Sequence, residues 1–231
     1  SDAELLAKGE RILKPAMIAL ASKVESVILG TAADAVYNTV GTAGSTVYDT
    51  STMLLAKDKL ARDLTPMGER KALLNSAAKQ YKQGYMGTAD GFDFLENEML
   101  PTHTNGNDIS FEVRTTLSAE GATSLVVEGL TTTTGTVTKG TTFTIDTVNK
   151  VHPQTKVDLG VLQDFVVTAD VTADGSGYAT LVVSPAIYTT TSQQNVSAFP
   201  VDGDTCNVKT GAASTGYVQN LVYHPSAFRF I

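Results

Sequence analysis

The spacing of apolar residues changes once along this 231-residue chain, and the change limits which folds the chain can adopt. Near the start, apolar residues recur every three or four positions, which is the spacing of one face of an α-helix. After about residue 106 they recur at every second position, which is the spacing of a strand with one buried face. The sequence therefore predicts an α+β protein.

The first helical pattern runs from Leu5 to Ile28 and is long for a compact domain. Its apolar positions are Leu5, Leu6, Ile12, Leu13, Ala16, Met17, Leu20, Val24, Val27 and Ile28. Ser1 followed by Glu4 fits a capping box, and Gly30 fits a helix end. Pro15 removes a backbone hydrogen bond in the middle of this pattern, so we expect a bend there.

A second helix is predicted from about Ser51 to Leu64, closed by the Thr-Pro pair that follows. Its apolar face consists of Met53, Ala56, Leu60 and Leu64. We predict a short strand or turn at Ala72 to Asn75, followed by a helix that ends at Gly84.

The stretch GYMGTADGFDFLENEMLPTHTNG, from Gly84 to Gly106, separates the two portions. Three glycines in its first eight residues argue against a regular helix or strand. Its apolar residues nevertheless favour burial, so we expect its aromatic side chains to pack one unit of the molecule against the other.

The β portion is rich in threonine, valine and glycine. Apolar residues alternate with polar ones in four runs: Phe111, Val113 and Leu117; Phe143 and Ile145; Phe165, Val167, Ala169 and Val171; and Ala179, Leu181 and Val183. Turn-forming clusters such as SAEGA, HPQTK and TADGSG separate the runs. This pattern predicts a β-barrel with a core of its own.

The composition narrows the classes of function. A net charge of −7 and a pI near 4.9 argue against a nucleic-acid-binding surface, which needs clustered Lys and Arg. No apolar run approaches the ~20 residues that span a bilayer, so we expect a soluble protein without a membrane partner. The only cysteine, Cys206, is expected to be a buried structural thiol. Because the chain has no initiator Met, we expect it to be part of a longer polypeptide.

Several motifs resemble chemical sites, but their residues favour structural roles. GTVTKGT, at Gly135 to Thr141, lacks the order of a phosphate-binding loop and predicts a β-turn. DVTADGSG, at Asp170 to Gly177, lacks the ligand spacing of a calcium loop and predicts a hairpin loop. The three histidines, His103, His152 and His224, have no partner at metal-ligand spacing and are expected in loops.

The densest acidic cluster is Asp90, Asp93, Glu96 and Glu98. Paired carboxylates can carry out acid-base chemistry, but these alternate with Phe92 and Phe94, which favours packing with the carboxylates outward. The triplet NVS at Asn195 matches a glycosylation acceptor of a kind that arises by chance. We therefore predict no enzymatic activity, catalytic residue, metal site or cofactor.

A resemblance joins these portions. It rests on eight segments that follow one another in this order over almost the whole chain: LAKGERILKPAMIALASKVES, VYNTVGTAG, LTPMGERKALLNSAA, QGYMGTADGFDFLENEMLPTHTNG, VTKGTTFTID, VLQDFVVTADV, YATLVVSPAI and NLVYHPSAFRF. In this combination the chain resembles the major capsid proteins of tailed bacteriophages. It is most similar to the short-tailed-phage coat proteins that carry an extra β-barrel domain.

The resemblance implies the tailed-phage capsid fold, with a peripheral domain built on a long spine helix, an axial domain and an inserted barrel. Residues 1–30 would be the spine helix, 31–106 mostly the axial domain, 107–220 the inserted barrel and 221–231 the return to the capsid core. The implied function is a structural one: a self-assembling subunit of the icosahedral shell that encloses the phage DNA.

The implied partners are further copies of the chain in hexamers and pentamers, scaffolding protein during assembly, and a portal at one vertex, but no membrane and no specific nucleic acid sequence. The implied location is the virion, with assembly in the host cytoplasm. Family members also have an N-terminal arm, an extended loop and later segments, and LLNSAAKQYKQG looks short between Ala77 and Lys79. The alternative that the residues leave open is a β-rich carbohydrate-binding or adhesin module on a helical stalk.

Overall fold

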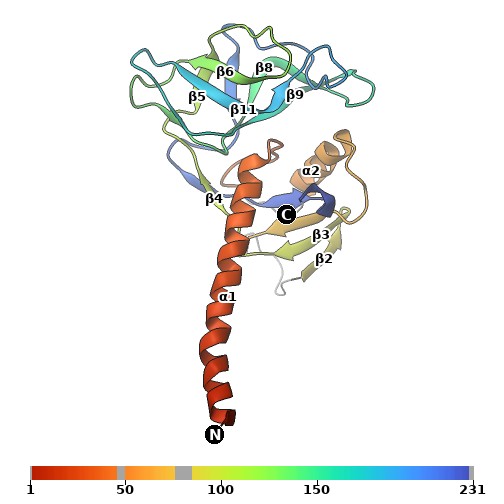
Figure 1. The fold of residues 1–231 in the computed structure, drawn as a ribbon. Helices are drawn as coiled ribbons and strands as arrows, with labels where there is room; N and C mark the ends of the chain where they lie inside the picture. The colour runs from red at the N-terminus through yellow and green to blue at the C-terminus, as the bar shows by residue number, and fades with distance from the viewer. Residues whose placement is uncertain (1, 46–49, 76–84, 229–231) are drawn as a thin grey trace.

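The structure is a computed structural model, and it describes residues 2–45, 50–75 and 85–228. A long helix projects from a small α/β unit, and a β-barrel lies beside that unit at the far end of the helix (Figure 1). The chain is therefore α+β, as predicted, and it contains a closed barrel of six strands.

Helix α1 spans Asp2–Ala35, which confirms the long helix at the start of the chain. It continues through Pro15 as one helix, and the bend at this position stays a prediction. The prediction that Gly30 ends the helix was wrong, because Thr31 to Ala35 extend the helix by another turn. The Thr31 hydroxyl donates a hydrogen bond to the Val27 carbonyl at 2.9 Å in this added turn. The capping residue Ser1 lies outside the described residues.

The expectation about apolar runs was also wrong. Leu13–Ala35, with a mean hydropathy of 1.4, is long and apolar enough by length and composition to cross a membrane, and it is not buried. Lys14, Lys23, Glu25 and Asp34 interrupt the apolar run in the sequence, but the mean hydropathy stays high because apolar residues dominate the rest of the span.

Helix α2 spans Thr50–Arg62 and covers a four-stranded sheet of order β14-β1-β3-β2. The strands are β1 (Lys71–Leu74), β2 (Tyr85–Ala89), β3 (Phe92–Glu96) and β14 (Leu221–Tyr223). As predicted, Met53 and Ala56 are buried, and a strand lies at Lys71–Leu74. Leu64 is exposed, contrary to expectation, because it follows the helix in a left-handed conformation with φ of 58°. The helix predicted before Gly84 lies outside the described residues.

The hairpin formed by β2 and β3 corrects the interpretation of the glycine-rich stretch. Asp90 and Gly91 both have positive φ, 52° and 85°, which is the conformation of a two-residue type I′ turn. Gly87, with φ of 83°, lies where the register between the two strands shifts. These glycines therefore shape a hairpin instead of preventing one. Phe92 and Phe94 pack with Met53 in the core of the sheet and α2, not against the barrel.

The barrel closes in the order β11-β6-β5-β12-β8-β9. Its strands are β5 (Ser110–Val113), β6 (Ala122–Glu128), β8 (Thr142–Val151), β9 (Asp158–Val167), β11 (Ala179–Ile187) and β12 (Thr205–Val208). Most of the predicted inward positions, including Phe111, Phe143 and Phe165, are buried in one cluster with neighbouring rings 5.7 and 5.9 Å apart. Leu117 and Val171 are only half-buried against this cluster, and the prediction for Ala169 was wrong because Ala169 follows the end of β9 and is exposed. Cys206 is 1% exposed in this core, as predicted. Short strands β7 (Thr136–Val137) and β10 (Val171–Thr172) pair beside the barrel.

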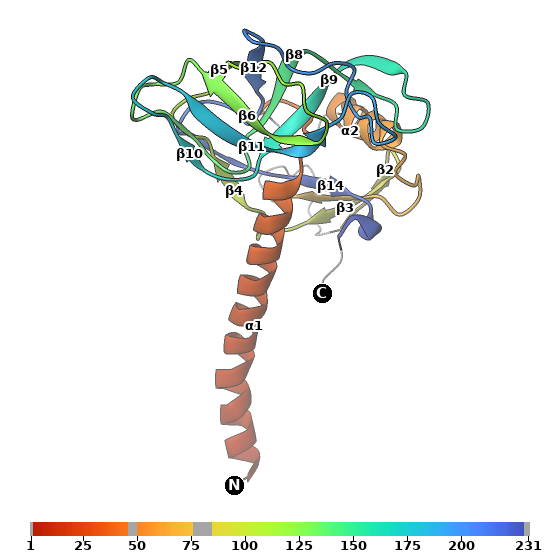
Figure 2. The ribbon, with the colours of Figure 1, turned by 45° about the horizontal axis from the view of Figure 1, so that its top comes forward.

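The chain enters and leaves the barrel through a two-stranded ladder. Strand β4 (Thr102–Thr104) precedes the barrel and β13 (Gly216–Val218) follows it, and His103 pairs with Tyr217 between them. After β13, strand β14 returns to the four-stranded sheet and pairs with β1, and the short 3₁₀ helix η2 (Pro225–Ala227) follows. Figure 2 shows the barrel on one side of this crossing and the sheet on the other.

Candidate assembly surface and interdomain junction

One face of α1 carries an exposed apolar stripe. At 100° per residue, Leu13, Met17, Leu20, Val24, Val27 and Ile28 fall within a sector of about 100°. Each of these side chains is exposed, Leu20 to 65%. Part of the stripe forms a shallow groove whose walls include Met17, Leu20 and Val24. We call these six residues the α1 stripe.

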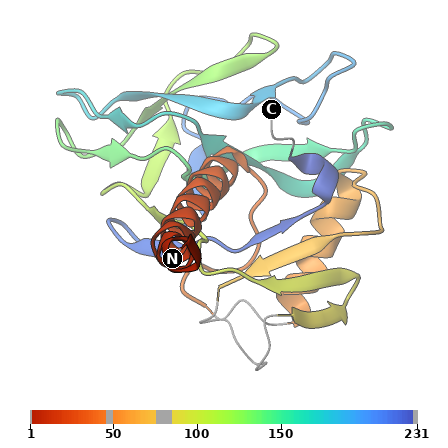
Figure 3. The ribbon, with the colours of Figure 1, turned by 60° about the horizontal axis from the view of Figure 1, so that its bottom comes forward.

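The opposite side of α1 attaches the helix to the protein. Leu29 packs against the small cluster of Leu73, Leu100 and Leu221. One turn earlier, the Glu25 carboxylate accepts a hydrogen bond from the Asn97 amide at 2.7 Å. Seen along its axis in Figure 3, α1 points away from the rest of the molecule. The helix is therefore held at its C-terminal end by Leu29 and Glu25, while the side chains of the α1 stripe stay exposed.

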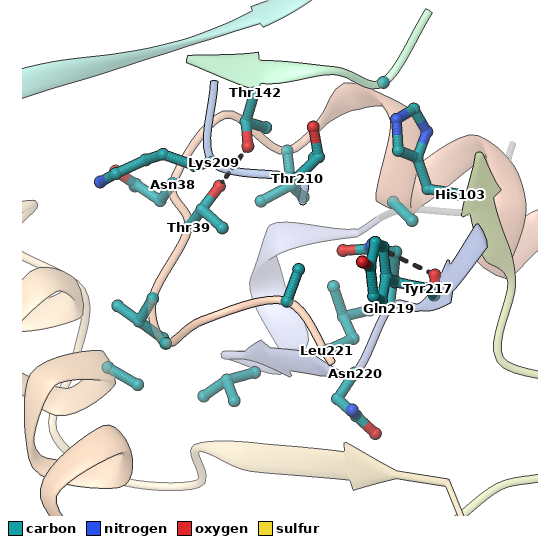
Figure 4. A pocket seen from close by; sticks show the side chains of 18 of the residues that line it. Asn38, Thr39, His103, Thr142, Lys209, Thr210, Tyr217, Gln219, Asn220 and Leu221 are labelled. Atoms are coloured by element: carbon teal, nitrogen blue, oxygen red, sulfur yellow. Dashed lines mark hydrogen bonds between the residues drawn. The ribbon is translucent and has the colours of Figure 1, made fainter. Parts of the chain in front are cut away.

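We call helix α2 and the four-stranded sheet that it covers the α2 unit. A cavity of about 590 Å³ lies where α1 ends, between the barrel and the α2 unit. The segment 36–45 forms one wall, and the segments around β4, β13 and Lys209 form others. Figure 4 shows the Thr39 hydroxyl bonded to Thr142 of β8 at one side of the cavity, a distance of 2.8 Å. Thr210 also lines the cavity, and its buried Oγ1 has no hydrogen-bond partner among the described residues.

A buried carboxylate ties three segments together at this junction. Asp164, on barrel strand β9, has a side chain that is only 1% exposed. It forms ion pairs with Lys59 of α2 and with Lys209, the latter at 2.9 Å. The Thr39 amide donates to the same carboxylate at 3.2 Å. The Lys59 ammonium also donates to the Thr39 carbonyl at 2.7 Å, so Thr39, Lys59 and Asp164 are each held by the other two.

A second ion pair joins the same elements. Lys150 of barrel strand β8 pairs with Asp63, which directly follows α2. The Asn38 amide donates to Asp63 at 2.7 Å. Burial, and then the Asp63 charge, raises the pKa of Tyr37. Burial, and then the charges of Lys209 and Lys150, lower the pKa of Lys59 to about 7, and the Asp63 charge partly opposes this shift.

His103 does not lie in a loop, contrary to expectation. It is part of β4, it is buried, and its Nε2 lies 3.0 Å from the Asn105 side-chain oxygen. Burial lowers the pKa of His103, and the Asn105 contact and the charges of Asp34 and Asp170 oppose that shift. The histidine therefore helps to fix the ladder at the entrance to the barrel. His152 and His224 instead bond to nearby backbone amides, as loop residues do.

The remaining sequence candidates have structural contacts. Asp174 accepts hydrogen bonds from the amides of Tyr178 and Ser176, which lower its pKa and shape the predicted hairpin loop. The turn of GTVTKGT places Lys139 3.2 Å from Asp34, at the end of α1. Asp93 of the acidic cluster accepts from the Thr88 hydroxyl. Burial, with nearby Asp and Glu charges, raises the pKa of the Cys206 thiol. Within residues 2–45, 50–75 and 85–228 no three His, Cys, Asp or Glu side chains are placed to hold a metal ion.

The junction cluster was missed at the sequence level. Lys59, Asp164 and Lys209 are far apart along the chain, so no local spacing brings them together. One signal was present: Asp164 interrupts the apolar run of VLQDFVV, where Gln163 to Val167 are all buried. A charged residue inside a buried strand requires a partner of opposite charge.

Comparison with known proteins finds a likeness among solved structures. No family model and no curated protein matches the chain. Among solved structures, the CUS-3 coat protein I-domain matches 46% of this chain and 99% of its own, at 22% identity and a TM-score of 0.32. The matched domain belongs, by its name, to a coat protein.

Proposed function

We propose that this chain is the structural subunit of an icosahedral phage shell, a major capsid protein that encloses DNA by assembling with copies of itself. The α1 stripe carries this proposal. Soluble monomers rarely expose large contiguous apolar patches, and patches of this kind mark interaction sites. The order of sequence motifs that resembles the tailed-phage coat proteins supports the same function.

The α1 stripe suits a role in assembly because burying it is favourable. Each large apolar side chain moved from water into a contact contributes about 1.5–3 kcal/mol. A shell repeats this gain at every copy, and it needs no catalytic group. In this proposal the copies form hexamers and pentamers, and scaffolding protein and a portal take part in assembly in the host cytoplasm.

A bilayer is a less suitable environment for the same helix. Lys23 and Glu25 lie near the middle of the apolar span, and a charged side chain at the centre of a membrane helix costs about 2.5–3.5 kcal/mol. The C-terminal end of the span also packs on the protein through Leu29 and Glu25. We therefore propose a protein partner for the α1 stripe.

Electron microscopy of the full-length gene product tests the proposal. We expect shells or capsomers with the native sequence, and their loss with Leu20→Asp, which places a charge in the α1 stripe. Ile18→Asp is the matched control, because Ile18 is 63% exposed on the same helix but lies about 160° away from Leu20. A chain that stays monomeric under all assembly conditions would contradict the coat function. Equal assembly by both variants would contradict the role of the stripe.

A further inference from the structure

The barrel is attached to the rest of the protein mainly by polar contacts. The described residues form three buried apolar clusters: one fills the barrel, one lies between α2 and the sheet, and one lies between the sheet and α1. None of the three combines barrel residues with residues of the other two units. The orientation of the barrel therefore depends on the ladder of β4 and β13 and on the charged groups at the junction.

The charges at the junction are unbalanced. Three ammonium groups, on Lys59, Lys150 and Lys209, meet two carboxylates, on Asp63 and Asp164. We call these five residues the junction cluster. Three of its side chains are less than a quarter exposed and Asp164 is almost fully buried, so an excess positive charge is poorly solvated there. Loss of one proton from an ammonium group makes the cluster neutral.

We propose that the junction cluster is a pH-sensitive lock, which holds the barrel in one orientation on the α2 unit and tightens as the pH rises above neutrality. Lys59 is the switching group, because it lies between the other members. It faces Asp164 on β9, Lys150 on β8, Lys209 after β12, and Asp63 after α2. The proposal holds whether or not the chain is a coat subunit.

The direction of the pH effect follows from proton binding. In the closed junction Lys59 has a pKa of about 7, whereas an exposed lysine has a pKa near 10.5. Below pH 7 both the closed and the open forms carry the proton, and their ratio does not depend on this group. Between pH 7 and 10.5, Lys59 takes up a proton when the junction opens. Each rise of one pH unit in this range therefore lowers the equilibrium constant for opening by up to about tenfold.

Thiol labelling of the full chain can follow the opening. Thr210 is 4% exposed in the junction cavity and its hydroxyl has no hydrogen-bond partner in the described part of the chain, so Thr210→Cys places a reporter there without breaking a hydrogen bond. The native Cys206 reports unfolding of the barrel core. Mass spectrometry of the peptides distinguishes the two cysteines.

Asp164→Asn tests the lock. We expect labelling of the reporter to accelerate at least tenfold while Cys206 stays protected. Asp158→Asn is the matched control on the same strand, because Asp158 bonds to Asn149 and Gly160 and not to the junction. Unchanged labelling of the reporter in Asp164→Asn would overturn the lock.

Lys59→Met tests the pH dependence. We compare the rate of reporter labelling in the protein that keeps Lys59 with the rate in the Lys59→Met variant. The ratio of the two rates cancels the titration of the thiol itself. We expect this ratio to fall between pH 7 and 9. A constant ratio would overturn the switch. If Asp164→Asn also exposes Cys206, the variant Lys209→Met provides the test instead. The Lys209 charge lowers the pKa of Lys59, so its loss should move the onset of tightening to higher pH. An unchanged onset would count against the proposal.

Discussion

The barrel and α1 bury their apolar residues to very different extents. Among the described residues, eighteen buried side chains form the barrel core, and the strands around it close so that no strand edge of the ring is unpaired. In α1, six large apolar side chains lie exposed along one stripe. The barrel thus contains the contacts that stabilise it, while α1 is held near its C-terminal end by Leu29 and Glu25 and leaves its stripe exposed. In the proposed assembly the first is a folded module and the second a contact element.

The α2 unit lies between these extremes. Its main buried cluster has five members in the described part of the chain, so polar contacts matter more there than in the barrel. Arg70 is 1% exposed and donates to the carbonyls of Thr65 and Pro66 at 2.7 and 2.8 Å. It thereby stabilises the turn that connects α2 to the sheet.

Truncation in the barrel core should have the largest effect on stability. Phe143 is fully buried between the rings of Phe111 and Phe165, so Phe143→Ala should lower the free energy of unfolding by about 3–5 kcal/mol. Denaturant unfolding measures the change. Val182→Ala, on the exposed face of the same barrel, should change it by less than about 0.5 kcal/mol. Similar values for both variants would mean that the barrel has no compact core of its own.

Loss of Arg70 should have an intermediate effect. Arg70→Met leaves the carbonyls of Thr65 and Pro66 without their charged donor and should cost about 2–3 kcal/mol in urea unfolding of the α2 unit. Arg62→Met removes an exposed pair with Asp58 on the same helix and should cost about 0.3–0.5 kcal/mol. An Arg70 variant as stable as the Arg62 variant would show that the polar contacts contribute little to this unit.

A charge in the α1 stripe should have the smallest effect on the isolated subunit. Leu20→Asp removes no buried contact, so the free energy of unfolding should change by no more than about 0.5 kcal/mol, the range of ordinary surface substitutions. Thermal melting of the monomer measures it. A loss above about 2 kcal/mol, outside that range, would indicate that the stripe is covered within the subunit.

The elements with one regular period could be predicted from the sequence. Alternation at Phe143 and Ile145, and at Ala179 and Leu181, predicted buried positions of the barrel because each strand buries one face. The long helix was equally clear from its spacing. Its end at Ala35 was missed because a single glycine is tolerated when the following residues continue the helix.

The features that depend on three-dimensional contacts could not be predicted in this way. Asp90 and Gly91 form a turn whose dipeptide was present in the sequence, but the neighbouring glycines masked the hairpin pattern. The junction cluster joins Lys59, Asp164 and Lys209 from separate elements, and only the fold brings them together. The α1 stripe was recognised as apolar, but its exposure is a property of the folded chain.

Hydrogen exchange of α1, in the free subunit and in assembled particles, tests most directly whether this helix is a contact element. In the free subunit, backbone amides from Leu13 to Val24 should exchange at least a hundredfold faster than those of β8 and β9, because that part of the helix lies before the contacts of Glu25 and Leu29 that hold it. In particles, the same amides should become strongly protected while the barrel changes little. Amides of α1 that are as protected as the barrel in the free subunit, or that stay unprotected after assembly, would contradict this account.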